Sequence, residues 1–216
     1  MNPDLNVALE MKRNHDLEFR FGFIESTDQL AELWDIDKRA YGEASISFET
    51  FQAWWRAYPS GLPVLHWKGR IGGAIGMWPL SERSASRLTN GQIREGLLKG
   101  RMIRPFRERA AAYWYFSGVV LRPELIGTRA IRVLLGGGLW HWIDVAAIAF
   151  PCRLLALSSS PEGQLLLTRF GFRCCRKAHI MPDGLALFAL DLVIRQDFTS
   201  LLERRRLQAA SGRVGN

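Results

Sequence analysis

Hydrophobic residues recur along the chain with two periods, one typical of strands and one typical of helices. Segments of the two kinds alternate. Apolar residues at every second position, or in a short continuous run, predict a strand, whereas apolar residues every three to four positions predict a helix. In the first half, the pattern predicts a strand at 18–25, helices at 27–42 and 47–58, and strands at 63–67 and 71–78. The turn Lys68-Gly69-Arg70 joins the last two strands into a β-hairpin.

The second half contains longer elements. After a predicted helix near Asn90–Leu98 comes the run YWYFSGVVL at 113–121, whose two apolar faces indicate a central strand. The other predicted elements are a helix from Thr128 to about Phe150, a strand at 153–157, a helix at 161–170, and strands at 172–180 and 185–193. The succession of strand, helix and strand over 113–157 predicts a parallel, right-handed crossover, with ligands at the carboxyl ends of its strands. This order indicates an α/β fold with a mixed sheet.

Length and composition fit one folded domain. The chain has 216 residues, of which 48% are hydrophobic, enough to bury a substantial core. We predict a flexible N-terminal arm at 1–17, a single domain at 18–195 and a basic C-terminal tail at 196–216.

Several protein classes are disfavoured by composition. No stretch approaches the roughly 20 uncharged apolar residues of a membrane span, and the first residues lack the pattern of a signal peptide, so we expect a cytoplasmic protein. Three cysteines, two of them adjacent at Cys174 and Cys175, do not suggest a disulfide framework, and the four histidines show no zinc-site spacing, so no metal is expected. A formal net charge of +8 favours an acidic partner: nucleic acid, a phosphorylated cofactor or an acidic carrier protein.

Three segments resemble the GNAT superfamily of N-acetyltransferases. They are the central strand YWYFSGVVL, the turn RPELIGTRAIRVLL that opens a helix, and the distal segment LLALSSSPEGQLLLTRFGFR. The resemblance implies a central mixed sheet with helices on both faces. It also implies transfer of an acyl group from acetyl-CoA, or from a longer acyl-CoA, to an amine of a small molecule or peptide.

The resemblance also implies where the acyl donor binds. The pantetheine arm would lie along the backbone of Val119, Val120 and Leu121, as an added strand does. The pyrophosphate would meet the N–H groups of Ile126, Gly127, Thr128, Arg129, Ala130 and Ile131, because a helix N-terminus attracts phosphate. Ser158, Ser159 and Ser160 occupy the place of a polar contact to the donor. This loop departs from the family pattern, since Ile126, Arg129 and Ile131 stand where Arg or Gln, Gly, and Gly or Ala are usual. The Arg129 side chain can either crowd a phosphate or grip it.

A second departure concerns catalysis. The family often places a tyrosine, which protonates the leaving thiolate, at the position of Leu167. Attack by an amine also needs a group that removes a proton. The main candidates for proton transfer are Glu95, Tyr115 and Ser117. Further candidates are Tyr113, the serines at 158–160, His66 and His179.

Two other functions remain open at this stage. A long-chain acyltransferase could take its acyl group from an acyl carrier protein, which Arg101, Arg104, Arg107 and Arg109 could meet, with the abundant Trp and Phe residues lining a chain tunnel. A module without catalysis could bind nucleic acid through these arginines and Arg204–Arg206, although no recognition motif with groove-reading spacing is evident. A homodimer is a possible assembly.

Overall fold

The structure is a computed structural model that describes residues 19–103, 112–145, 148–158 and 160–194. The predicted arm at 1–17 and the predicted tail at 196–216 lie outside these ranges. Arg104, Arg107, Arg109, Ser159 and Arg204–Arg206 lie outside them as well.

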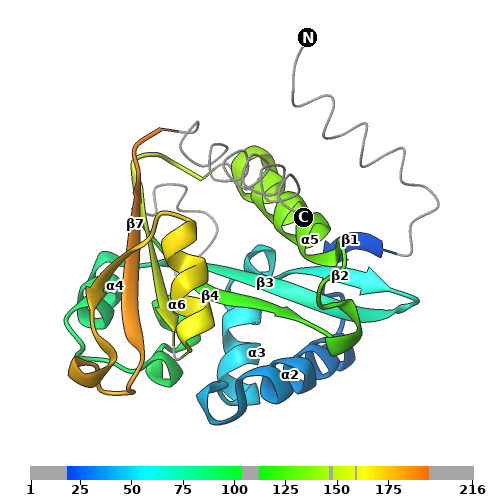
Figure 1. Cartoon of the computed structure of the whole chain (residues 1–216), viewed down its shortest axis with the longest axis horizontal. Helices are drawn as coiled ribbons and strands as arrows, with labels where there is room; N and C mark the ends of the chain where they lie inside the picture. The colour runs from blue at the N-terminus through cyan, green and yellow to red at the C-terminus, as the bar shows by residue number, and fades with distance from the viewer. Residues whose placement is uncertain (1–18, 104–111, 146–147, 159, 195–216) are drawn as a thin grey trace, which may run out of the picture.

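A seven-stranded mixed sheet forms the centre of the molecule (Figure 1), in the order β1-β2-β3-β4-β5-β7-β6. Its strands are β1 (Phe19–Phe23), β2 (Pro63–Trp67), β3 (Arg70–Leu80), β4 (Tyr113–Leu121), β5 (Cys152–Ser158), β6 (Arg173–Arg176) and β7 (Ala186–Leu192). The β4–β5 pair is parallel and the other pairs are antiparallel. The predicted mixed sheet is confirmed, and so is the central place of β4.

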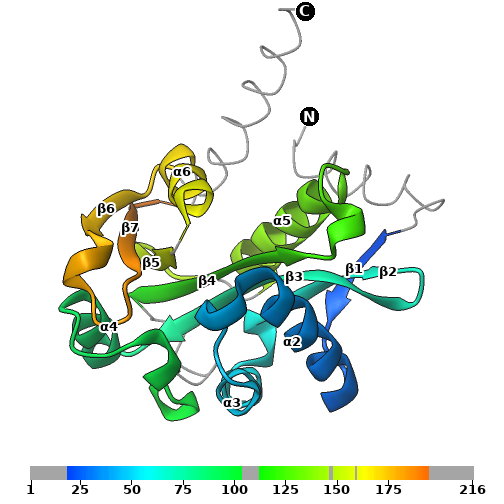
Figure 2. The same cartoon turned by 60° about the horizontal axis from the view of Figure 1, so that its bottom comes forward.

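Helices cover both faces of the sheet, as predicted. They are α2 (Thr27–Tyr41), α3 (Phe48–Ala57), α4 (Glu82–Thr89), α5 (Ala130–Trp140) and α6 (Pro161–Arg169). Figure 2 shows α5 and α6 over one face, with α2 and α3 under the other. The predicted starts of α2 and α3 are confirmed, because the Ser26 and Ser47 hydroxyls accept hydrogen bonds from the first turns of these helices.

One predicted helix was wrong. The helix expected near Asn90–Leu98 lies earlier, as α4, because Ser81 caps its N-terminus by accepting from the Ser84 N–H. Gly91, at a φ of 68°, follows its end. Residues Glu95–Leu97 form a single 3₁₀ turn. Glu95 therefore lies in a short connection, where its position depends on the residues that pack against this segment.

The helix predicted to extend to about Phe150 is shorter. The α-helical part, α5, ends at Trp140, and a π-helical turn follows at His141–Val145. The glycines within α5 bring the helix close to the sheet, since a Cβ on Gly137 would lie 2.3 Å from the ring of Phe21. The strand predicted at 172–180 is also shorter, because a 3₁₀ turn at Ala178–Ile180 follows β6.

A cluster of aromatic side chains joins α3 to the middle of the sheet. Trp54, Trp78 and Tyr115 are almost completely buried, and the Trp54 ring meets the other two edge to face, at centroid distances of 5.5 and 6.0 Å. The Trp54 indole N–H donates to the carbonyl of Leu98. The cluster therefore fixes the connection that carries Glu95 against the centre of β4.

Neither a membrane span nor a metal cluster is found in the part of the chain that the structure describes. No helix there is both long and apolar enough to cross a bilayer. No three His, Cys, Asp or Glu residues within the same ranges are grouped as metal ligands would be.

Candidate functional site

The two parallel strands at the centre of the sheet separate halfway along their length. Residues Tyr113–Phe116 of β4 pair with Arg153–Ala156 of β5, and the pairing ends there although β4 continues to Leu121. The edge of β4 that faces β5 is therefore unpaired over Ser117–Leu121. Such an edge offers backbone N–H and C=O groups to an extended molecule.

A β-bulge marks the point of separation. Gly76 of β3 pairs with Gly118 and Met77 pairs with Phe116, which leaves Ser117 as an extra residue in β4. Gly118 has a φ of 131°, which a residue with a side chain rarely adopts. The Ser117 hydroxyl accepts a hydrogen bond from the Trp78 indole N–H at 2.9 Å. Ser117 is therefore held in the bulge by the aromatic cluster.

Beyond the bulge, the register decides which backbone groups are available. The Arg122 N–H donates to the Gly72 carbonyl of the β3 segment at 2.9 Å. Backbone groups alternate between the two edges of a strand, so those of Val120 also face β3, whereas those of Val119 and Leu121 face the gap. Of the three residues predicted to hold the pantetheine arm, Val119 and Leu121 present free-edge backbone groups, and Val120 does not.

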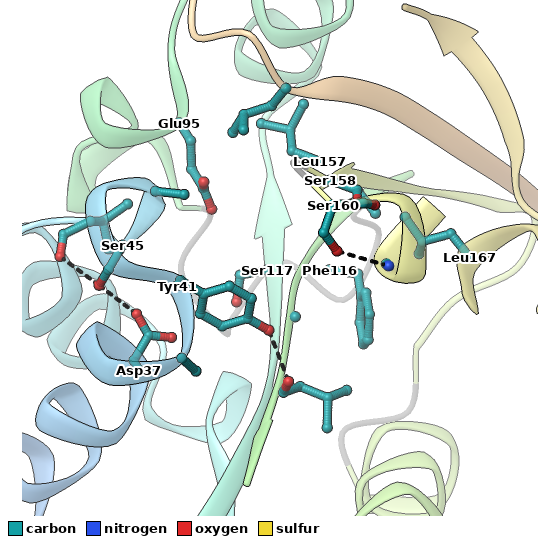
Figure 3. Close-up of a pocket in the computed structure, with 18 of the residues that line it drawn as sticks. Asp37, Tyr41, Ser45, Glu95, Phe116, Ser117, Leu157, Ser158, Ser160 and Leu167 are labelled. Atoms are coloured by element: carbon teal, nitrogen blue, oxygen red, sulfur yellow. Dashed lines mark hydrogen bonds between the residues drawn. The ribbon is translucent and has the colours of Figure 1, made fainter. Parts of the chain in front are cut away.

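A cavity of about 280 Å³ lies at the gap. Residues from α2, α3, the Glu95 connection, β4, β5 and α6 line it, among them Asp37, Tyr41, Ser45, Phe51, Trp54, Glu95, Phe116, Ser117, Val119, Ser158, Ser160 and Leu167. Figure 3 shows Asp37, Tyr41 and Glu95 on one side of β4, with Ser158, Ser160 and Leu167 on the other. Glu95, Ser117, Val119, Ser158 and Ser160 were predicted from the sequence as site residues, and the fold brings them into one cavity.

Glu95 is the carboxylate of this cavity with the most perturbed acidity. Its pKa is raised to about 7, mainly by burial; a hydrogen bond from Tyr115 opposes this shift, and the charges of Asp37 and Asp183 add to it. The Tyr115 hydroxyl donates to Glu95 Oε1 at 2.5 Å, and the Asp183 carboxylate accepts from the Glu95 N–H at 3.2 Å. A carboxyl group with a pKa near neutrality can both take up and release a proton at physiological pH.

Tyr115, also a predicted catalytic residue, has a different place. Its side chain is 1% exposed and is not among the residues that line the cavity. Burial and the neighbouring Glu95 charge raise the pKa of its phenol well above the usual value. Tyr115 therefore orients the Glu95 carboxylate as a permanent hydrogen-bond donor.

Three residues at the end of α2 and just after it were not predicted from the sequence. The Ser45 hydroxyl donates to Asp37 Oδ2 at 2.6 Å, and burial raises the pKa of Asp37 while this bond lowers it. The Tyr41 hydroxyl donates to the Val119 carbonyl at 2.8 Å (Figure 3). The spacing of four residues between Asp37 and Tyr41, which places both on one helix face, was a usable signal.

The serines after β5 have mainly local partners. Ser160 caps α6, because its hydroxyl accepts from the Gly163 N–H at 3.0 Å, and the Ser158 hydroxyl donates to the Ser160 carbonyl at 3.2 Å. Leu167 is 6% exposed and presents only an apolar side chain to the cavity. His66 and His179 do not line it.

In the loop before α5, every second backbone N–H donates a hydrogen bond within the loop itself. The N–H groups of Ile126 and Thr128 donate to carbonyls three residues earlier, and the Ala130 N–H donates to the Thr128 hydroxyl at 3.1 Å. The N–H groups of Gly127, Arg129 and Ile131 have no acceptor among the described residues. Half of the amides predicted to receive a pyrophosphate are thus available to an anion, at the positive end of the helix dipole.

The Arg129 side chain reaches toward β1. Its guanidinium carbon lies 5.9 Å from the centre of the Phe19 ring, in a cation–π contact with β1. The guanidinium is engaged with β1, and it keeps a positive charge next to the loop.

Comparison with solved protein structures identifies the fold of the chain. No family model matches the sequence, and no curated protein matches it. Among solved structures, the loading GNATL domain of CurA from Lyngbya majuscula is 13% identical, with a TM-score of 0.58 over 80% of this chain and 97% of that domain. The chain has the GNAT fold. The GNAT-like decarboxylase GphF in complex with isobutyryl-CoA is 16% identical, with a TM-score of 0.57 over 80% of this chain and 98% of that one.

A GNAT-fold enzyme with an amine substrate is also similar. Diaminobutyrate acetyltransferase EctA from Paenibacillus lautus, in complex with L-2,4-diaminobutyric acid and coenzyme A, is 12% identical. Its TM-score is 0.52, over 80% of this chain and 94% of that one. The resemblance noted in the sequence is thereby confirmed for the GNAT fold.

Proposed function

We propose that this GNAT-fold protein is an acyltransferase that moves an acyl group from a coenzyme A thioester to an amine. The observation that carries the proposal is the Glu95 carboxyl, with a pKa raised to about 7, in a cavity at the point where β4 separates from β5. Two similar structures contain coenzyme A or an acyl-CoA, and one of them also contains an amine substrate. These two structures support the class of reaction. The kind of acceptor is inferred from the residues of this chain alone.

The donor would use two sets of backbone groups, one at the β4 edge that β5 leaves unpaired and one in the loop before α5. Pantetheine carries amides, which can pair with the backbone of Val119 and Leu121 as an added strand would. The pyrophosphate would accept from the Gly127, Arg129 and Ile131 amides, next to the Arg129 guanidinium. The thioester would then lie near the bulge at Ser117, within the cavity.

Glu95 would act on the amine. The neutral amine attacks the thioester carbonyl carbon, and the carboxylate removes the extra proton from the attacking nitrogen, directly or through one water. Asp37, on the same side of the cavity, would attract a cationic amine to this place. Tyr115 would keep the Glu95 carboxylate oriented throughout.

The first experiment measures donor binding and turnover. Dialysed protein is titrated with acetyl-CoA by calorimetry, and thiol release is followed with ethanolamine, putrescine, L-lysine and a tripeptide as acceptors. We expect binding heat and amine-dependent thiol release. Absence of both would contradict the proposal. Turnover with an acylated carrier protein but not with acetyl-, octanoyl- or palmitoyl-CoA would instead support the carrier-protein alternative.

A pair of substitutions at Arg129 tests the phosphate site. Arg129 has a φ of −69°, which proline matches, so Arg129→Pro removes the N–H with little strain at this residue. Arg129→Ala is the matched control, since both variants lack the guanidinium and only the proline lacks the amide. One hydrogen bond to a charged group contributes about 1.5–3 kcal/mol. We therefore expect the proline variant to bind coenzyme A about 10- to 100-fold more weakly than the alanine variant, as calorimetry would measure. Equal affinities would place the pyrophosphate elsewhere.

A further inference from the structure

The leaving thiolate needs a proton donor, and the residue at the expected position has none. Leu167 is buried and apolar. Glu95 takes the proton of the amine, so a second group must deliver one to sulfur. Among the described residues that line the cavity, Tyr41 carries the only phenol.

The serine hydroxyls of the cavity are less suited to this role. The Ser45 hydroxyl donates to Asp37, and the Ser158 hydroxyl donates to the Ser160 carbonyl. The Ser117 hydroxyl accepts from the Trp78 indole N–H, and an aliphatic hydroxyl is a much weaker acid than a phenol. Each is engaged in a contact that supports the local structure of the site.

We propose that Tyr41 is the proton donor of the leaving thiolate, and that the Val119 carbonyl holds its hydroxyl in place until the acyl donor arrives. This inference rests on the proposed acyl transfer. It assigns the role to a residue at the end of α2, on the opposite side of β4 from Leu167 (Figure 3).

The position of Tyr41 supports this role. Its hydroxyl reaches the unpaired edge of β4, where it donates to the Val119 carbonyl at 2.8 Å. Gly118 favours this approach, because a Cβ at that residue would lie 3.0 Å from the Tyr41 hydroxyl oxygen and crowd it. The side chain is 39% exposed, so the hydroxyl can leave Val119 without disturbing the core.

Donor binding would exchange one hydrogen bond for another. The Val119 carbonyl faces the gap, and it is the acceptor that a pantetheine amide would use in strand addition. When the pantetheine N–H takes this acceptor, the Tyr41 hydroxyl is released beside the bulge, where the thioester would lie. Tyr41 then offers its proton only when a donor is present.

The proton transfers form a closed cycle. The amine nitrogen bonds to the carbonyl carbon and passes a proton to the Glu95 carboxylate. The C–S bond then breaks, its electron pair stays on sulfur, and the Tyr41 O–H gives its proton to that sulfur. The tyrosinate recovers a proton from the Glu95 carboxylic acid, directly or through water. Burial and the charges of Asp37 and Glu95 raise the pKa of Tyr41 to about 12, so the phenol is protonated at the start of each cycle.

Tyr41→Phe tests the assignment. With acetyl-CoA and the panel amine that reacts fastest with the wild type, we expect kcat to fall about 100-fold, the lower end of the range for a missing acid or base. Coenzyme A affinity, measured by calorimetry, should stay equal or increase, because the competing bond to Val119 is lost. Tyr58→Phe is the matched control, because the pKa of Tyr58 is also raised to about 12 but the residue is buried and does not line the cavity, so kcat should be unchanged.

A second readout separates proton donation from a structural role. The acetyl thioesters of N-acetylcysteamine and of thiophenol are compared as donors, because the aryl thiolate is a better leaving group that needs less protonation. Tyr41→Phe should slow the alkyl thioester about 100-fold more than the aryl thioester. Equal slowing of both donors, or an unchanged kcat with acetyl-CoA, would overturn the inference while leaving the acyl transfer in place. A wild-type protein without thiol release would remove both proposals.

Discussion

Glu95→Gln is expected to lower the rate of amine-dependent thiol release by about 10²- to 10⁴-fold, because the amide cannot accept a proton from the attacking nitrogen. Glutamine has nearly the same shape, and its carbonyl oxygen can still accept the hydrogen bond from Tyr115. Glu82→Gln, at an exposed position in the first turn of α4, is the matched control and should keep the wild-type rate. Loss of turnover in Glu95→Gln with unchanged coenzyme A affinity would separate chemistry from donor binding.

The pH profile checks the same assignment. The base must be deprotonated, so kcat/KM of the wild type, calculated on the concentration of neutral amine to remove the titration of the acceptor itself, should rise with pH through about 7, the pKa of Glu95. This limb should disappear in the residual activity of Glu95→Gln. A wild-type rate that is flat between pH 5 and 8, or a variant with the same rising limb, would show that another group is the base.

The raised pKa of Glu95 also has a consequence for stability. The unfolded carboxyl titrates near 4.5 and the folded one near 7, so the folded state binds more protons between these values and loses stability as the pH rises through them. At pH 8 the cost is about 3 kcal/mol, from the free energy of one pKa unit. Glu95→Gln should therefore be more stable than the wild type by up to this amount at pH 8, and about equal to it at pH 4, in denaturant unfolding. A Glu95→Gln variant that is more stable but less active would show that the buried carboxylate lowers the stability of the fold while it serves catalysis.

Much of the fold could be predicted because local signals and tertiary packing agree. Ser26 and Ser47 precede amphipathic segments and do cap α2 and α3. The apolar run at 113–121 predicted a central strand, and it forms β4, the fourth of the seven strands, whose residues are buried or half-buried. Ser160 before Pro161 was similarly a local cap signal.

The errors lie where local signals compete. Ser81 and Asn90-Gly91 are a start and an end signal for α4, whereas the later segment has helix-forming residues without a cap. The glycines of α5 indicate weak helix propensity, yet close packing against Phe21 keeps the helix intact. For α4 the deciding signal, the Ser81 cap, is local and was overlooked, whereas for α5 the decisive contact comes from Phe21, which the local pattern does not reveal.

The site was predictable in part for the same reason. Glu95 was a candidate because a carboxylate suits proton transfer, but its raised pKa depends mainly on burial in the fold and also on the charges of Asp37 and Asp183, which are distant in the sequence. Tyr41 was not predicted, because its meeting with the Val119 carbonyl joins residues 78 positions apart. Sequence patterns predict the residue types and the elements. The positions of Glu95 and Tyr41 at the cavity depend on how α2 and the Glu95 connection pack against β4.

That dependence on packing leads to the largest expected effect on stability. Trp54→Ala should destabilise the protein by about 3–5 kcal/mol, the usual cost of removing a buried aromatic side chain. For a chain of this size the melting temperature should fall by roughly 6–20 °C. Trp54 is completely buried against Trp78 and Tyr115, so little relaxation into the space is expected. Calorimetry or thermal circular dichroism would measure the shift.

Trp54→Phe separates the indole hydrogen bond from the volume of the side chain. The phenyl ring fills much of the space but leaves the Leu98 carbonyl without its donor, at a cost of about 1–3 kcal/mol. Because Leu98 follows the turn that carries Glu95, we also expect lower kcat with unchanged coenzyme A affinity. Trp55→Phe is the matched control on the same helix: its indole nitrogen has no partner within the described ranges, so the loss of that N–H should cost little. If the two phenylalanine variants were equally active and equally stable, the Trp54 bond would not be what holds Glu95 in the cavity.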